Sequence, residues 1–268
     1  MSPTASADII DSAESIRALV GTIEAMAPKP GLFVDLEGVK LSRHGLIAIM
    51  QILVPPSPTV HLIDVHALQR EAFETPGPGG ETLRSLLEST QHPKVFFDLR
   101  RDSDALYSHF GIKLHCVVDL QLVEFATRPM RGRFLKGLAT CIAEQTGRLG
   151  YSQSREWQSV KKAGKRLFDP EQGGTYEVFL ERPLPTAIRD YCVQDVVVMP
   201  KLLFIYATKL KPHLGSQVHS ETLWRVRLSQ SPGFNPNGPH MSLGPNFTWM
   251  RLVSRCVPFD VVGPLPVS

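Results

Sequence analysis

Apolar runs and helical periodicity divide the first 212 residues into alternating helical and extended segments. Apolar residues recur at helical spacing over 12–26, and Asp11 with Glu14 three residues on has the spacing of a capping box, so we expect a helix there. Three apolar runs follow, at 32–38, 44–54 and 59–65. Consecutive strands separated by short turns predict an antiparallel meander.

Shorter segments of both kinds continue along the chain. Helices are expected at 82–89, 102–110, 121–126, 135–148 and 154–163, and strands at 94–97 and 116–120. A long helix is expected over 184–211, and Pro200 should kink or divide it. This order predicts an α/β domain with a mixed sheet, flanked by helices, over about residues 11–212. Residues 1–10 are expected to be a flexible N-terminus, and 213–268, rich in proline, an irregular C-terminal tail.

Composition excludes several classes of protein. The 268 residues are 43% apolar and 21% charged, which is ordinary globular usage and argues against disorder and a coiled coil. The longest apolar run, 45–56, is shorter than the roughly 20 residues that span a bilayer. The four cysteines have no CxxC spacing, and the N-terminus lacks a secretory pattern. We therefore expect an intracellular protein, cytoplasmic or nuclear, with no membrane association.

The net charge of +3 hides an uneven distribution. Residues 128–166 contain ten basic and two acidic side chains, a net charge of +8, so the rest of the chain carries −5. Such a block can attract a polyanion and steer its approach. The alternative is that these charges only solvate two helices.

Acidic residues stand where solubility explains them poorly. Asp35 and Glu37 lie two apart in an otherwise apolar strand, so alternation places both on one face. Carboxylate pairs are ligands for Mg²⁺ or Mn²⁺, although an acidic pair on a solvent-facing edge is the alternative. Asp102 and Asp104 begin a helix, where one of them could simply cap it.

A phenol and a carboxylate share one face of the late helix. Tyr191 and Asp195 are four residues apart, a spacing that directs both side chains to the same side. The alternative is a tyrosine packed on the core beside a solvated aspartate. Valines surround Asp195, however, which favours a specific role for it.

Three segments together resemble a known family. DLEG, RDSDALYSHFGIKL and YCVQD are similar in order, spacing and context to the three exonuclease motifs of the DEDD superfamily. The match is to its tyrosine subclass, DEDDy, which includes RNase D and the Werner exonuclease domain, and it spans roughly residues 30–210. The histidine subclass would have His where this chain has Asp190. The resemblance implies an RNase H-like fold and 3′-5′ exonuclease activity.

Site roles carry over from these motifs. Asp35 and Glu37 match the first acidic pair, Asp195 the last acid and Tyr191 the tyrosine, and the middle acid falls on Asp102, with Asp104 as the alternative. The resemblance implies that the four acids hold two divalent cations, Mg²⁺ or Mn²⁺, for hydrolysis that releases nucleoside 5′-monophosphates. Tyr191 would orient the attacking water.

Further residues are expected to contact nucleic acid. They are Leu36, Gly38, His44, Arg101, Lys161, Lys162, Lys165 and Arg166. Tyr151 and Trp157 are available for base stacking, although a tryptophan in a helix is more often part of a core. A lone histidine such as His44 is more often a surface residue.

The expected substrate is the single-stranded 3′ end of a nucleic acid. RNA is preferred over DNA because compact RNase D-like relatives mostly process RNA. The alternative function is a catalytically weak or inactive nuclease fold that binds nucleic acid or acts as a scaffold, which the complete set of acids and tyrosine argues against. We also expect the C-terminal tail to dock a protein partner.

Overall fold

A six-stranded sheet forms the centre of the computed structural model, which describes residues 6–130 and 132–247. The strands are Ala7–Ile10 (β1), Leu32–Glu37 (β2), Ile49–Leu53 (β3), Val60–Asp64 (β4), Lys94–Phe96 (β5) and Val117–Asp119 (β6). Their order across the sheet is β1-β4-β3-β2-β5-β6. β2, β3 and β4 pair antiparallel, while β1, β5 and β6 add in parallel. The mixed sheet with its antiparallel meander is therefore confirmed.

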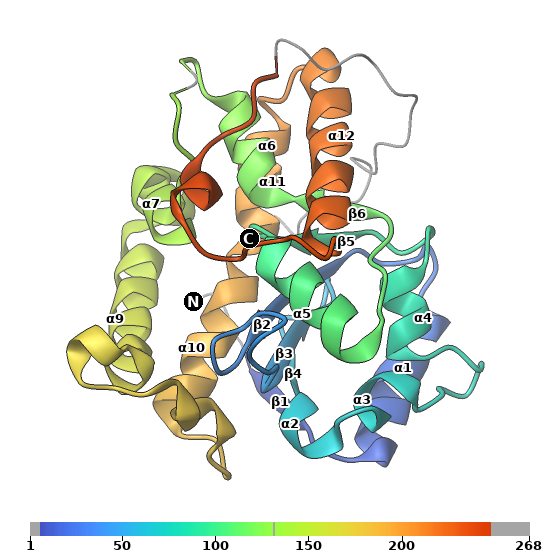
Figure 1. Cartoon of the computed structure of the whole chain (residues 1–268). Coiled ribbons are helices and arrows are strands. Elements are labelled where there is room, and N and C mark those ends of the chain that lie inside the picture. The colour runs from blue at the N-terminus through green and yellow to red at the C-terminus, as the bar shows by residue number, and fades with distance from the viewer. Residues whose placement is uncertain (1–5, 131, 248–268) are drawn as a thin grey trace.

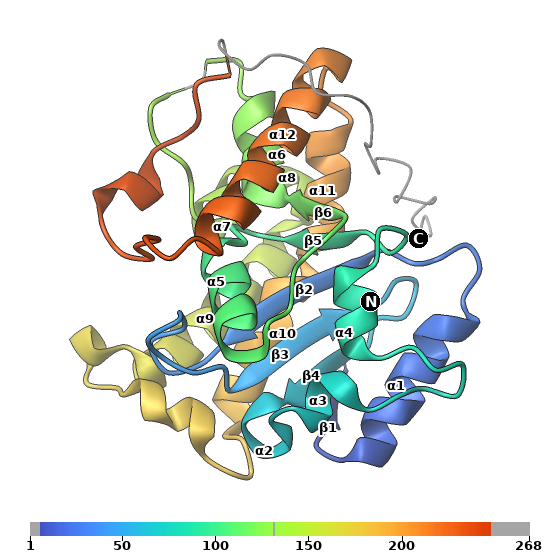
Figure 2. The same cartoon turned by 45° about the vertical axis from the view of Figure 1, so that its right-hand side comes forward.

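Helices cover both faces of this sheet (Figures 1 and 2). They are Ala13–Ala25 (α1), Val65–Leu68 (α2), Glu71–Glu74 (α3), Leu83–Glu88 (α4), Arg100–Phe110 (α5), Leu120–Thr127 (α6), Leu138–Glu144 (α7), Thr146–Leu149 (α8), Tyr151–Phe168 (α9), Thr186–Val197 (α10), Met199–Ala207 (α11) and Pro212–Ser229 (α12). Short 3-10 turns are Pro170–Gln172 (η1), Tyr176–Leu180 (η2) and Pro239–Ser242 (η3). Across the described ranges, none of the helices is both long and apolar enough to cross a bilayer.

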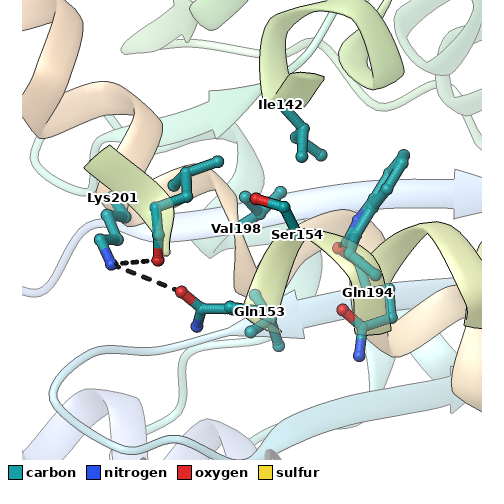
Figure 3. Close-up of a pocket in the computed structure, with 9 residues that line it drawn as sticks. Ile142, Gln153, Ser154, Gln194, Val198 and Lys201 are labelled. Atoms are coloured by element: carbon teal, nitrogen blue, oxygen red, sulfur yellow. Dashed lines mark hydrogen bonds between the residues drawn. The ribbon is translucent and has the colours of Figure 1, made fainter. Parts of the chain in front are cut away.

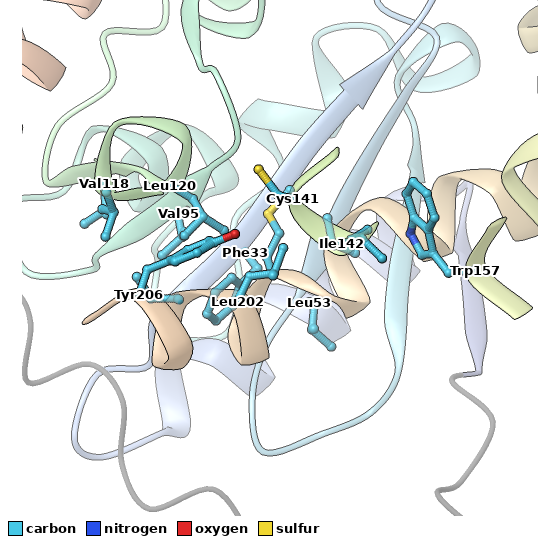
Figure 4. Packing of buried hydrophobic residues seen from close by; sticks show 14 of the residues in the cluster. Phe33, Leu53, Val95, Val118, Leu120, Cys141, Ile142, Trp157, Leu202 and Tyr206 are labelled. Atoms are coloured by element: carbon cyan, nitrogen blue, oxygen red, sulfur yellow. The ribbon is translucent and has the colours of Figure 1, made fainter. Parts of the chain in front are cut away.

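The alternation of side chains along β2 separates two cores. Leu32, Val34 and Leu36 pack on one face with α1, α4 and α5. Phe33 lies on the other face, in the cluster with α6, α10 and α11. Figure 4 shows this second cluster, with Phe33, Leu53, Val95, Val118, Leu120, Cys141, Ile142, Trp157, Leu202 and Tyr206. Asp35 and Glu37 lie on the same face of β2 as Phe33, so both acids point toward the side of the sheet that α10 covers.

The N-terminal expectation is wrong for residues 7–10. These residues form β1, which pairs in parallel with β4, and Ile10 is buried. The partner strand lies far along the chain, after β2 and β3. A four-residue strand gains its stability from that distant pairing, so its local pattern does not reveal it.

Helix ends follow local sequence signals in two of three cases. The long late helix is divided at Val198, and Pro200 stands in the first turn of α11 as expected. Gly111 ends α5 with a left-handed φ of 71°. The predicted N-cap of α1 is wrong by one residue. Ser12, not Asp11, caps the helix, and it forms the capping box with Ser15, not with Glu14.

The expectation of an irregular chain after residue 212 is wrong for α12. This helix buries polar side chains, among them Arg225, whose Nη1 lies 2.6 Å from Asp119 Oδ2 on β6. A helix held by buried charges lacks the apolar periodicity that predicts helices, which explains the error. Residues 248–268 lie outside the described part of the chain, so the partner-docking tail stays a prediction.

Candidate active site

Two elements bring three carboxylates together. Asp35 and Glu37 extend from the same face of β2, and Asp195 extends from α10, which packs across β2, β3 and β4. One oxygen of each carboxylate lies within 4.8 Å of the other two. The strand period of two and the packing of one helix are therefore sufficient to assemble this acidic cluster.

Asp102 lies close to this cluster. It stands in the first turn of α5 and is 5% exposed. Burial raises the pKa of its carboxyl well above the usual range, and the charges of Asp35 and Asp98 add to the shift. The Asp102 charge in turn contributes to the raised pKa of Glu37. Asp102 is thus a fourth acid within electrostatic reach of Asp35 and Glu37.

Asp104 is engaged elsewhere. Its side chain is fully buried and accepts hydrogen bonds from Arg43, at 2.7 Å from Nε and 2.8 Å from the main-chain N–H. The Arg43 guanidinium also donates to the main-chain carbonyls of Ser229 and Ser231, both at 2.8 Å. Asp104 therefore has the partners of a structural ion pair.

Burial and mutual repulsion dominate the electrostatics of the cluster. Burial raises the pKa of Asp35 well above its usual range, and the charges of Asp195 and Glu37 raise it further. Burial, followed by the charge of Asp195, raises the pKa of Glu37 to about 8. Oxygen atoms this close are mutually repulsive unless a cation lies among them. An all-oxygen donor set with this demand for positive charge fits Mg²⁺ or Mn²⁺.

Lys161 supplies a positive charge to the cluster. Its Nζ lies 2.5 Å from Asp195 Oδ2 and 2.9 Å from the centre of the Tyr191 ring. The side chain thus turns inward, in place of the phosphate contact that the sequence suggests. Lys161 shares a helical face with the buried Trp157 and Gly164, a spacing that could have indicated this direction.

Tyr191 is positioned by two neighbouring segments. Its ring meets that of Phe168 edge to face at 5.0 Å. A Cβ on Gly164 would lie 2.5 Å from the Tyr191 Cβ, so only glycine permits this approach of α9 to α10. Burial, and then the charge of Glu37, raise the pKa of the phenol. Tyr191 therefore keeps its proton at neutral pH.

The residues expected to bind nucleic acid near β2 differ in availability. Leu36 is 2% exposed and its side chain packs in the core. A Cβ on Gly38 would lie 2.1 Å from the Leu46 carbonyl oxygen, so packing alone explains this glycine. His44 is exposed. Arg101 is also exposed and donates to Asn237 Oδ1 at 2.9 Å.

The remaining basic and aromatic candidates lie on α9. Lys162, Lys165 and Arg166 are exposed, and Lys165 pairs with Asp169 at 3.3 Å. Trp157 is buried and donates from Nε1 to the Gln194 carbonyl, so its ring belongs to the core. Tyr151 is 71% exposed. Only the tyrosine of this pair is therefore available for stacking.

A charge network beside Asp102 is not predicted by the sequence pattern. Asp98 has a left-handed φ of 63° and accepts from Arg100 Nε at 2.5 Å. Its main-chain N–H donates to Asp119 Oδ1 at 3.0 Å, and Arg225 lies between both acids. A left-handed non-glycine residue needs such support. Asp119 and Arg225 are distant from Asp98 in sequence, so no local signal predicts these two contacts.

A small cavity lies between α9 and α10 (Figure 3). Its volume is about 50 Å³, and Ser154, Trp157, Gln194 and Lys201 are among its lining residues. Lys201 Nζ donates to the Leu149 carbonyl at 2.8 Å. None of the three clustered acids lines the cavity, and neither does Asp102, so this cavity is separate from their site.

Comparison with known proteins gives a consistent result. A model of the 3′-5′ exonuclease family matches residues 9–211. The mouse (Mus musculus) piRNA biogenesis protein EXD1 is 29% identical over 158 residues, which are 59% of this chain and 25% of that protein. This chain therefore aligns with about a quarter of that curated relative.

Solved structures of RNase D share the fold. Trypanosoma brucei RNase D with GMP has a TM-score of 0.65 and 21% identity, covering 85% of this chain and 65% of that chain. The same enzyme with RNA U12 has a TM-score of 0.64 and 19% identity, covering 94% and 77%. Escherichia coli RNase D has a TM-score of 0.59 and 18% identity, covering 84% and 50%. At these identities the likeness shows the fold.

Proposed function

This chain belongs to the 3′-5′ exonuclease family. We propose that it removes nucleotides from the 3′ end of single-stranded nucleic acid by phosphodiester hydrolysis. The products are nucleoside 5′-monophosphates. The single observation that carries the proposal is the convergence of the Asp35, Glu37 and Asp195 carboxylates within 4.8 Å. A fold that only binds a polyanion would gain nothing from acids clustered against it, which disfavours an inactive scaffold.

The acids are proposed to hold two divalent cations, Mg²⁺ or Mn²⁺. Asp35, Glu37 and Asp195 supply the clustered oxygens, and Asp102 supplies a fourth carboxylate nearby. Such cations stabilise the attacking and leaving oxygens of an in-line displacement at phosphorus. Without them, the same carboxylates would repel the phosphate of the substrate.

Tyr191 is proposed to orient the attacking water. Its phenol keeps its proton, since burial and the charge of Glu37 raise its pKa. A protonated phenol is a poor general base but can both donate and accept a hydrogen bond. Phe168 and Gly164 fix the ring, so the hydroxyl is held in place before substrate binds.

We assign the middle acid to Asp102. The support is electrostatic, because Asp102 interacts with Asp35 and Glu37, whereas Asp104 is held by Arg43. Asp102→Asn should therefore abolish cleavage with little loss of stability. Asp104→Asn should lower the melting temperature more than it lowers kcat. The reverse pattern would move the assignment to Asp104.

RNA is the proposed substrate in preference to DNA. The support comes from relatives, one of which is a piRNA biogenesis protein and another an RNase D in complex with RNA U12. His44 lies in the segment after β2, and Arg101 lies in the first turn of α5. Both side chains are exposed, and both are proposed to contact phosphates of the terminal nucleotides. The main chain at Leu36 and Gly38 would support the terminal nucleotide.

Digestion of matched oligonucleotides tests the function. Single-stranded and duplex RNA and DNA of one sequence, labelled at the 5′ end, are incubated with Mg²⁺, with Mn²⁺ or with EDTA. We expect a ladder that shortens one nucleotide at a time on single-stranded RNA, with either metal and not with EDTA. Internal fragments without a ladder, or equal cleavage in EDTA, would refute the proposal.

A further inference from the structure

One face of α9 carries a row of basic side chains that begins with a tyrosine. Tyr151, Arg155, Lys162 and Arg166 follow one another at intervals of four, seven and four residues. These intervals place them on one side of a helix with 3.6 residues per turn. All four are exposed, and Tyr151 is 71% exposed. We call these four residues the outer row.

The outer row and the acidic cluster share one helix. The opposite side of α9 buries Ser154, Trp157 and Gly164, and Lys161 reaches Asp195 from it. Lys162, in the outer row, is the next residue in the chain. Figure 1 shows α9 running beside α10, which carries Asp195 and Tyr191. A single-stranded nucleic acid that leaves the cluster would reach the outer row by crossing from the inner to the exposed side of α9.

Solvation alone explains this row poorly. Within the described residues, Arg155, Lys162 and Arg166 form no ion pair, and α9 contains a single acid, Glu156. Lys162 and Arg166 are four residues apart, as are Lys161 and Lys165, and like charges at that spacing destabilise a helix. A bound polyanion would offset this repulsion.

We propose that the outer row binds the sugar-phosphate backbone of the single strand that leads to the 3′ end. Arg155, Lys162 and Arg166 pair with phosphates, and Tyr151 stacks on a base beyond them. The row is about 22 Å long, from the fifteen steps of about 1.5 Å between Tyr151 and Arg166. This inference rests on the proposed exonuclease function, because it assigns the path of that enzyme's substrate.

Binding measurements at several salt concentrations test the row. The variant Arg155→Glu, Lys162→Glu, Arg166→Glu is compared with Lys113→Glu, Lys211→Glu, Arg227→Glu, which changes the charge equally at other exposed positions. Fluorescence anisotropy of a labelled 15-nucleotide single strand is measured in EDTA. We expect the outer-row variant to bind at least about tenfold more weakly, with a negative slope of log K against log salt that is smaller in magnitude by about 2. The control should keep the wild-type slope.

Two further measurements separate the row from the catalytic proposal. Tyr151→Ala should weaken binding without changing the salt slope, because stacking releases no counterions. Hydrolysis of a dinucleotide by the wild-type protein reports on the acidic cluster, since that substrate is too short to reach the row. An outer-row variant that binds with wild-type affinity and slope would overturn the inference, even if the dinucleotide is cleaved.

Discussion

Lys161 occupies the place where the carboxylates of the cluster need positive charge. Its Nζ pairs with Asp195, while Asp35 and Glu37 lie next to that pair. The charge of Lys161 lowers the pKa of all three acids and partly offsets the effect of burial. A divalent cation bound by the same oxygens must therefore displace this ammonium group or share Asp195 with it.

Removing the Lys161 charge should strengthen metal binding. In Lys161→Met the cation no longer competes with an ammonium group, so we expect Mn²⁺ affinity to rise at least about tenfold, or about 1.4 kcal/mol. Titration calorimetry with MnCl₂ measures this. Lys162→Met, a loss of the same charge on the exposed side, is the control and should leave the affinity nearly unchanged. A weaker Mn²⁺ affinity in Lys161→Met would show instead that Lys161 helps to form the metal site.

Lys94 predicts a pH dependence of stability away from the site. Burial lowers the pKa of this lysine from 10.5 to about 8, and its Nζ donates to the carbonyls of Leu86 and Ser89. Between these two pKa values the unfolded chain binds more protons than the folded one, so the free energy of unfolding rises with pH, by at most about 3 kcal/mol.

The contribution of Lys94 is isolated by comparing how the free energy of unfolding changes with pH in two proteins. Urea denaturation of the wild type and of Lys94→Met is measured from pH 7.5 to 10.5. We expect the wild type to gain stability relative to Lys94→Met as pH rises, whatever the absolute cost of the substitution. Parallel pH profiles would mean that Lys94 is not titrated abnormally in the folded protein.

At the level of residues, the sequence predicts which side chains of one element share a site better than it predicts their ion-pair partners on other elements. Asp35 with Glu37, and Tyr191 with Asp195, are related by strand and helix periods, which are local. The Asp104 interaction with Arg43 and the Lys161 interaction with Asp195 join separate elements. Such pairs depend on how elements pack, and no spacing in the chain encodes that.

The contact between α9 and α10 sets the position of Tyr191. Gly164 lies against Tyr191, and a methyl group there would come within 2.5 Å of its Cβ. The rings of Phe168 and Tyr191 meet edge to face on the same side. Movement of α9 by a fraction of an ångström would therefore displace the phenol.

Gly164→Ala should lower activity while the protein stays folded. The added methyl displaces Tyr191, and misplacement of this size reduces kcat by about ten- to a hundredfold. Gly147→Ala, at an exposed position in α8 where a Cβ meets no atom within 4 Å, is the matched control. Exonuclease rates and melting temperatures are measured for both. Equal kcat values for the two variants would exclude this positioning role.

Elements were predictable where their signals are local. The meander β2-β3-β4 and the break between α10 and α11 follow from alternation and from Pro200. The sequence pattern does not predict β1 or α12. β1 depends on pairing with the distant β4, and α12 buries charged residues in place of an apolar stripe. Long-range pairing, not propensity, decides both.

At the scale of the whole molecule, α12 and the segment after it are packed against the α/β sheet. Arg225 pairs with Asp119, and Arg100 Nη2 donates to the Met241 carbonyl at 2.7 Å. Ser229 Oγ lies 2.8 Å from Ser103 Oγ on α5. A boundary at residue 212 would therefore cut through buried polar contacts.

Truncation of the chain tests whether a domain boundary lies at residue 212. Ending the chain at residue 211 leaves buried Asp119 without Arg225, and breaking a buried pair of this kind costs about 3–5 kcal/mol. We expect that protein to be insoluble or to melt far below the full chain. A stable, active 1–211 fragment would restore the boundary at 212.

The acidic cluster is proposed to hydrolyse the 3′-terminal phosphodiester. The most direct test is the time course of nucleoside 5′-monophosphate release from single-stranded RNA in Mg²⁺, by the wild type and by Asp195→Asn, with folding checked by circular dichroism. We predict that Asp195→Asn loses at least about a thousandfold in rate, the scale of one lost catalytic interaction or more. A folded Asp195→Asn protein that releases 5′-monophosphates at the wild-type rate would contradict the claim.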